Sequence, residues 1–373
     1  MFKLIKGQQQ AHRILGQLIN EGKAGQSYLF YGPAGVGKLS TALEFAKIIN
    51  CKHPDAGADE TCTSCHKIDS FTHPDVDLIF PTPKFDVSDE GEYKKQDEQQ
   101  QVQAYIEQLK LTPYERMQFG KATAIHVDSI RMIERKLRYR PNEGNFRVVI
   151  IVQAEEMTVQ AANAFLKTLE EPPPYAAIIL TTTNYSRLLP TIISRCQKVR
   201  FNAIPAKVIE EHLIQHYYTE PTLARISARI ANGSMAKAVQ FSKTDFIEAR
   251  KMALDIIDAV MKDNLATIYR ISQNFASNRN EELLKDILDF LAIWFDDVCS
   301  YTHGSESISN IDHEDKLQEF LDMYQVSDRI IQNIVLLFEE YKRMLSGHVH
   351  HELILINTYY ELRKRLHSQG NYL

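Results

Sequence analysis

The sequence predicts an α/β domain with a parallel sheet, followed by a part of the chain that is helical throughout. Over roughly the first 200 residues, short apolar runs typical of buried strands alternate with segments of helical periodicity. From Pro205 onward the strand patterns disappear and the helical patterns continue. A glycine-rich loop lies between the first apolar run, Tyr28–Tyr31, and the helix that follows it. The alternation and the loop together predict an α/β fold that binds phosphate.

The glycine-rich loop has the sequence Gly-Pro-Ala-Gly-Val-Gly-Lys, residues 32–38. Backbone N–H groups of such a loop converge on an anion, the following helix adds a favourable dipole, and the lysine adds charge. The predicted phosphate-binding residues are Gly32, Gly35, Gly37 and Lys38. The pattern requires Ser or Thr after the lysine, but Leu39 stands there and Ser40 comes one place late. We therefore expect an intact phosphate cradle without its Mg²⁺ ligand.

A second metal position is also altered. Catalytic phosphate-loop enzymes place an acid at the end of a buried strand to hold Mg²⁺, often with a glutamate beside it that orients water. The matching strand is residues 148–152, and the corresponding residues are Val152 and Gln153. Glu155 and Glu156 come later, where we expect them on the solvated surface of a following helix. The sequence therefore predicts weak ATP binding or none, and no hydrolysis.

Composition limits the class of protein. The 373 residues are 44% apolar and 24% charged, which describes an ordinary globular chain with room for two or three domains. A net charge of −5 argues against coating DNA by bulk electrostatics. No run approaches the ~20 apolar residues of a membrane span, and the N-terminus lacks the apolar core of a signal peptide. We expect a cytoplasmic protein without a membrane partner.

The order of predicted elements gives the domain plan. Strands are predicted at residues 28–31, 76–80, 147–152, 177–182 and 198–201, and helices at residues 8–18, 127–137 and 161–169. Residues 86–101 are acidic and glutamine-rich, with almost nothing to bury, so we predict a solvated insertion there. Residues 102–119 suit a helical arm with a turn at Thr112-Pro113. Short helices follow over 205–242, and longer ones over 245–367.

Two further motifs carry a specific resemblance. Residues 163–173 read Asn-Ala-Phe-Leu-Lys-Thr-Leu-Glu-Glu-Pro-Pro, and residues 189–196 read Leu-Pro-Thr-Ile-Ile-Ser-Arg-Cys. Over residues 7–242 the chain resembles the bacterial replicative clamp loaders, AAA+ proteins that open the sliding clamp and place it on primed DNA. The resemblance implies an AAA+ domain at 1–203, a small helical lid domain at 204–243 and an all-α collar domain at 244–373. The segment at about 85–121 departs from the family.

Two kinds of clamp-loader subunit share these motifs. One is the ATPase subunit, gamma or tau, and the other has lost ATP chemistry while keeping its place in the ring. Leu39, Val152 and Gln153 match the second kind, as does Ala236, which stands where the ATPase subunit carries an arginine over the nucleotide. The resemblance implies a non-hydrolysing stator within the DNA polymerase III holoenzyme. The alternatives are an active ATPase subunit with an unusual metal shell and a purely structural scaffold.

Arg195, in the Ser-Arg-Cys segment, is the residue to which the resemblance gives a catalytic role in trans. In the family this arginine reaches toward the ATP of a neighbouring subunit, and its planar, permanently charged fork suits phosphate oxygens. The alternative is a structural salt bridge at a helix end. We expect Ser194 to orient or cap the segment and Cys196 to be a small core residue. The implied partners are the gamma/tau ATPase, the clamp-opening delta subunit, the sliding clamp and primed DNA.

Three of the five cysteines cluster in the sequence, which in a cytosolic protein suggests a metal site rather than disulfides. Cys51, Cys62 and Cys65 resemble the four-cysteine zinc excursion of the family, here residues 51–68. The fourth cysteine is missing, but three thiolates and one histidine make a valid tetrahedral set. His53 or His66 would complete it, and the alternative is a decayed site held by packing.

Overall fold

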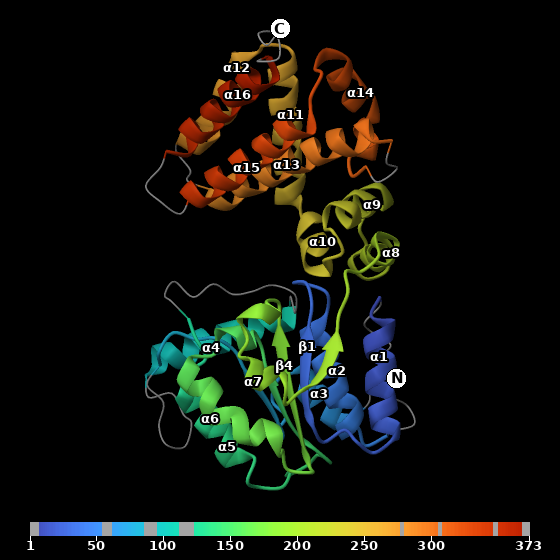
Figure 1. The fold of residues 1–373 in the computed structure, drawn as a ribbon, viewed down its shortest axis with the longest axis vertical. Helices are drawn as coiled ribbons and strands as arrows, with labels where there is room; N and C mark the ends of the chain where they lie inside the picture. Colours follow the sequence, from blue (N-terminus) through green and yellow to red (C-terminus); the bar gives the residue numbers. More distant parts are fainter. Residues whose placement is uncertain are drawn as a thin grey trace. The chain divides into compact units, whose positions relative to one another are not determined.

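The computed structural model describes residues 7–53, 62–85, 95–111, 123–276, 280–304, 308–345 and 350–367. Its contacts form two compact units (Figure 1). One unit consists of Met1–Val208 and Gly233–Ala236, and the other of Ile209–Asn232 and Lys237–Leu373. The finer division into an AAA+ domain, a lid and a collar stays a prediction.

The first unit is built on a parallel sheet of five strands. They are β1 (Ser27–Tyr31), β2 (Val76–Ile79), β3 (Arg147–Ile151), β4 (Ala176–Thr182) and β5 (Gln197–Arg200). The strand order is β2-β3-β4-β1-β5, and every pairing is parallel. All residues of β3 and β4 are buried, which explains why their sequences are continuous apolar runs rather than alternating ones. The predicted parallel α/β fold is confirmed.

Helices cover both faces of this sheet, as the alternating side chains of β1 show. The Tyr28 ring contacts the Phe45 ring of α2 (Lys38–Asn50), while Leu29 faces the cluster formed with α5 (Val127–Lys136) and α6 (Val159–Glu170). The remaining helices of this layer are α1 (Gln9–Asn20), α3 (Thr63–Asp69) and α7 (Pro190–Ile193). Because helices cover both faces of the sheet, a ligand of this unit is expected to bind at the strand ends and the loops.

In the second part of the predicted solvated insertion at 86–101, the described side chains other than Glu98 are exposed, but the chain is helical rather than irregular. Residues 86–94 lie outside the described residues, but helix α4 (Gln96–Leu111) already begins at Gln96. Its buried side chains Val102, Tyr105 and Leu109 pack against Phe80, with the Tyr105 and Phe80 ring centroids 4.1 Å apart. The predicted helical arm is thus real to residue 111, and the predicted turn at Thr112-Pro113 lies outside the described residues.

The second unit is helical throughout the part that the structure describes. Its helices include α8 (Ala206–Tyr217), α9 (Pro221–Ile230), α10 (Met235–Phe241), α11 (Thr244–Met261), α12 (Leu265–Ala276), α13 (Glu281–Thr302), α14 (Glu314–Met323), α15 (Asp328–Leu345) and α16 (His351–His367). Aromatic rings of α13, α14 and α15 meet in its core, where Phe295 contacts both Phe320 and Phe338. Among the described residues, no helix is long and apolar enough to cross a membrane.

A buried carboxylate anchors the turn that leads into β3. Asp75 is fully buried and accepts hydrogen bonds from the backbone N–H groups of Asn142 and Glu143, both at 2.7 Å, and of Gly144 at 2.9 Å. The guanidinium of Arg147 donates to Asp75 Oδ1 at 3.2 Å, the same oxygen that accepts from Asn142. Burial alone would raise the pKa of Asp75, but these N–H groups and Arg147 outweigh burial and lower it. The carboxylate therefore stays charged and holds the start of β2 to the start of β3.

Candidate functional site

The glycine loop joins β1 to α2 in the geometry of a phosphate cradle. Gly35 and Gly37 have φ values of +71° and +92°, a left-handed backbone that residues with a side chain adopt at a cost. Gly37 is the N-cap of α2, so the backbone N–H groups in the first turn of that helix face the loop. The buried Lys38 ammonium donates to the carbonyl oxygen of Gly32 at 2.8 Å and also to that of Pro33. Two hydrogen bonds thus hold the Lys38 side chain against the loop.

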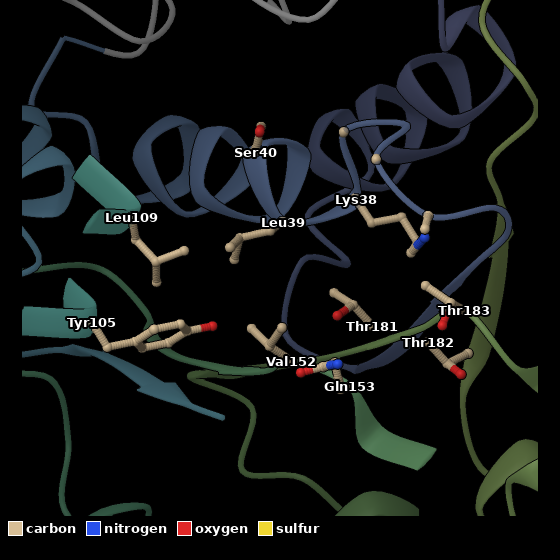
Figure 2. A pocket seen from close by; sticks show the side chains of 13 residues that line it. Lys38, Leu39, Ser40, Tyr105, Leu109, Val152, Gln153, Thr181, Thr182 and Thr183 are labelled. Carbon is tan, nitrogen blue, oxygen red and sulfur yellow. The ribbon is translucent and has the colours of Figure 1, made fainter. Parts of the chain in front are cut away.

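The loop borders a pocket at the carboxyl ends of the strands. Gly35, Gly37 and Lys38 line it from the loop, Val152 and Gln153 follow β3, and residues 181–183 end β4. This is where parallel α/β sheets bind ligands. Ser40 also lines the pocket, but Figure 2 shows that Leu39 is directed toward Val152 whereas Ser40 is not. Ser40 is therefore badly placed to act as a metal ligand in the position of Leu39.

The pocket has a polar half and an apolar half. On the polar half, Figure 2 shows Lys38 near Thr182 and Thr183, with Gln153 beside Thr181. On the apolar half, Tyr105 and Leu109 of α4 point toward Leu39 and Val152. The apolar half contains the two positions at which a catalytic phosphate-loop enzyme would place its Mg²⁺ ligands.

Helix α4 covers this apolar half. Leu39 and Val152 both pack against the buried cluster that contains Tyr105 and Leu109. Helix α4 belongs to the segment at about 85–121 that departs from the family, so this segment contributes directly to the site. The sequence analysis did not predict this contribution. The available signal was the apolar spacing 102, 105, 106 and 109, which repeats on one helical face inside a polar stretch.

The two glutamates after β3 are not solvated surface, so that prediction is wrong. Both lie half-buried in a short 3₁₀ helix, Ala154–Glu156, rather than on the longer helix. The Glu155 carboxylate accepts from the backbone N–H of Thr183 at 3.0 Å and from its hydroxyl at 2.8 Å. Glu156 pairs with Arg187 at 3.0 Å. One oxygen of Glu155, Oε1, thus holds the residue that follows β4 beside the pocket.

Residues 233–236 close over the loop. The Ala236 N–H donates to the Gly35 carbonyl at 3.3 Å, and a Cβ placed on Gly35 would stand 2.2 Å from the Ser234 hydroxyl. Only glycine fits at position 35 with this neighbour. Ala236 therefore lies at the phosphate loop. The resemblance to clamp loaders implies that an ATPase subunit carries an arginine at this position, whereas the methyl group of Ala236 offers no charge.

Arg195 follows α7 and is 30% exposed. Its Nε donates to the Glu170 carboxylate at 2.8 Å, and Nη1 donates to the Thr191 carbonyl at 3.0 Å. The Ser194 hydroxyl donates to the same carbonyl at 3.1 Å. Burial raises the pKa of the Cys196 thiol to about 12, as expected of an inert core cysteine. The segment thus holds its arginine at the surface of the unit, paired with an exposed carboxylate.

Cys51, Cys62 and Cys65 form a buried cluster whose sulfur atoms lie within 4.8 Å of one another. Burial by itself would raise the pKa of Cys62, but backbone N–H groups of residues 52, 64 and 65 outweigh it and lower the pKa to about 7. A thiol so close to ionisation, beside two more sulfurs, fits a metal such as zinc.

The fourth ligand is not evident among the described residues. His53 and His66 are both exposed, and neither belongs to the cluster. Residues 54–61 of the predicted excursion lie outside the described part of the chain. His53 or His66 as fourth ligand therefore stays a prediction.

Comparison with known proteins shows the family to which the chain belongs. The family model described as DNA polymerase III, delta subunit, matches residues 7–205. The chain is 29% identical to DNA polymerase III subunit delta' of Bacillus subtilis over 345 residues, which is 92% of either chain. It is 27% identical to the delta' subunit of Pseudomonas aeruginosa, covering 81% of this chain and 80% of that one.

Similarity to an ATPase-type relative is less extensive. The tau subunit of Bacillus subtilis is 30% identical, but the match covers 64% of this chain and 36% of tau. The delta' subunits are matched along most of their length, and the clamp-loader resemblance carried by the two sequence motifs is confirmed. The chain therefore belongs to the DNA polymerase III, delta subunit, family and falls with the delta-prime subunits of the bacterial clamp loader.

Proposed function

We propose that this chain is the non-hydrolysing stator of the replicative clamp loader. In this role it joins the gamma/tau ATPase subunits and the clamp-opening delta subunit and helps load the sliding clamp onto primed DNA in the cytoplasm. It closes one end of the ATPase arc, and Arg195 acts on the ATP of the neighbouring subunit. The delta-prime relatives, matched along most of their length, support the assignment.

The observation that carries the absence of hydrolysis is the apolar closure by α4. Mg²⁺ binds oxygen ligands and gives up its water reluctantly. Leu39 and Val152 have no side-chain oxygen, and both pack against the cluster that contains Tyr105 and Leu109, which line the same pocket. In this proposal, α4 covers the positions of both missing ligands and so adds to the effect of their loss.

The scaffold alternative has one observation in its favour, the pairing of Arg195 with Glu170. An exposed ion pair of this kind contributes only ~0–1 kcal/mol, so it holds the arginine loosely and does not prevent it from reaching a phosphate. Because the pair is weak, the arginine-finger role and the scaffold role predict different effects of substituting Arg195 and of substituting Glu170.

Restoring oxygen ligands at positions 39 and 152 tests whether α4 excludes Mg²⁺ from the site. Leu39→Thr with Val152→Asp supplies both missing oxygens but places them against α4, so we expect no Mg²⁺-dependent ATP binding and no turnover. Adding Tyr105→Ala and Leu109→Ala removes the apolar cover, and Mg²⁺-dependent binding should then rise by about tenfold or more. Fluorescent-nucleotide titration with Mg²⁺ and with EDTA measures both.

The control carries Tyr105→Ala and Leu109→Ala alone, which opens the space without providing ligands and should not gain Mg²⁺-dependent binding. Tight Mg²⁺-dependent binding by the Leu39→Thr, Val152→Asp protein, with α4 unchanged, would show that the helix does not exclude the ion. Lys38→Ala in the four-substitution protein checks that any gain uses the phosphate loop.

We also propose that the cysteine cluster binds one zinc ion, with His53 or His66 as fourth ligand. Cys51 caps the end of α2, and Cys62 caps the start of α3. The ion would therefore hold these two helices together. Elemental analysis of protein purified without added metal should show one zinc more in wild type than in Cys62→Ser. Three freely reactive thiols and no zinc would favour a decayed site held by packing.

A further inference from the structure

A second group of potential metal ligands lies in the helical unit, far from the cysteine cluster in sequence. Cys299 and His303 stand one turn apart at the end of α13, and Asp328 is the first residue of α15. One ligand atom from each lies within 4.8 Å of the other two. Residues one turn apart share a helix face, which brings the thiol and the imidazole to the same side. The proposed delta-prime role does not use any of these residues.

The two distances from Asp328 oxygens to the other ligand atoms are close to those in a formed coordination site. The Cys299 sulfur is 3.8 Å from one Asp328 oxygen, and His303 Nε2 is 3.5 Å from the other. In a tetrahedral site with bonds of ~2.0–2.3 Å, neighbouring ligand atoms are ~3.3–3.6 Å apart. All three ligand atoms lie within 4.8 Å of one another, and rotations of the exposed His303 and Asp328 side chains would bring them into range.

The orientation of the imidazole supports the same reading. His303 Nδ1 lies 2.8 Å from the Cys299 carbonyl oxygen. A carbonyl only accepts hydrogen bonds, so this contact places a proton on Nδ1 and leaves Nε2, which faces the Asp328 carboxylate, as the nitrogen that would bind a metal. Metal-binding histidines are commonly fixed by such a hydrogen bond from their other nitrogen.

We propose that Cys299, His303 and Asp328 bind a divalent ion of the zinc type. A thiolate, an imidazole and a carboxylate suit this ion, and three protein ligands leave a fourth position for water. On binding, the metal–sulfur bond replaces the S–H bond, and the thiol proton goes to solvent. The ion would lie near the carbonyl end of α13, where the helix dipole favours a cation. It would tie the end of α13 to the start of α15, two helices that already pack together.

Metal titration of the full-length chain tests this site. We expect wild-type protein to bind one more equivalent of Co²⁺ than the Cys299→Ser, His303→Gln or Asp328→Asn variants, with thiolate–cobalt absorption lost in Cys299→Ser. Affinity at this site should fall more than about tenfold in each variant, because even the loss of a ligand's hydrogen-bond partner costs roughly 10- to 100-fold. Zn²⁺ should compete with Co²⁺ and raise the Tm of wild type more than that of the variants.

His313→Gln is the matched control, since His313 pairs with Asp312 at 3.7 Å in the same unit but belongs to no group of three ligands in the described residues. It should leave the metal content unchanged. Equal metal content and equal affinity in wild type and all three variants would overturn the proposal. His303 is exposed, so His303→Gln keeps the test valid even if another variant folds poorly. Loss of the equivalent in Cys62→Ser instead would assign it to the other cluster.

Discussion

Replacing Arg195 by alanine is expected to slow ATP hydrolysis at the one neighbouring site that faces this subunit by on the order of 10³-fold. The arginine stabilises charge that develops on the phosphate oxygens, and alanine offers nothing in its place. Total ATPase of a complex with other working sites would fall only in part. Clamp loading needs concerted firing, so it should fall further than total hydrolysis. Both are measured on reconstituted complexes that differ only at this residue.

Glu170→Gln separates a catalytic arginine from a structural salt bridge. It removes the partner of Arg195 seen here but leaves the guanidinium free to reach across an interface. If Arg195 acts on the neighbour's ATP, Glu170→Gln retains activity while Arg195→Ala loses it. Arg195→Lys should rescue poorly, because a point charge lacks the planar fork. Equal effects of Glu170→Gln and Arg195→Ala would reduce Arg195 to a surface ion pair.

Asp75→Ala is expected to destabilise the first unit by about 3–5 kcal/mol, the usual cost of leaving a buried charge without its partner. Arg147 would lose its counter-charge, and the three N–H groups of residues 142–144 would lose their acceptor. Urea unfolding of the full-length chain measures the change. Lys67→Ala is the control, because it breaks the exposed Lys67–Glu143 pair beside the same turn and should cost less than ~1 kcal/mol.

The same carboxylate has a predictable pH dependence. The folded protein lowers the pKa of Asp75 below its ordinary value of 3.8, so the charged form contributes stability at neutral pH. That contribution is lost as the pH falls below 3.8 and through the folded-state pKa. Asp75→Asn should therefore be less stable than wild type at pH 7 and should show a smaller loss of stability on acidification. Parallel pH profiles of the two proteins would contradict this account.

The fold could be predicted well because its signals are local. The buried strands are continuous apolar runs, and the glycine loop occurs between a strand and a helix, as a phosphate cradle requires. The missing ligands at Leu39 and Val152 could also be read directly, since each is defined by its distance along the chain from a motif. The structure adds that both side chains pack in one cluster.

What the sequence did not reveal depends on partners distant in the chain. Helix α4 was missed over 96–101 because its apolar face is narrow and the residues it covers, such as Phe80 and Val152, are far away. Glu155 reads as a surface acid until Thr183 is placed beside it, 28 residues later. The sequence motif likewise identifies Arg195 without its partner Glu170. In each case tertiary packing decided what local pattern could not.

ATP hydrolysis by a reconstituted clamp loader whose only intact ATPase site faces this subunit measures the role of Arg195 in trans without a background from other sites. We predict turnover with wild type and with Glu170→Gln, a loss of about 10³-fold with Arg195→Ala, and none at all once that last neighbouring site is also inactivated. Turnover by the Arg195→Ala complex at the wild-type rate would contradict the role in trans. Turnover that persists with every neighbouring site inactive, and is lost on Lys38→Ala, would show that this chain hydrolyses ATP itself.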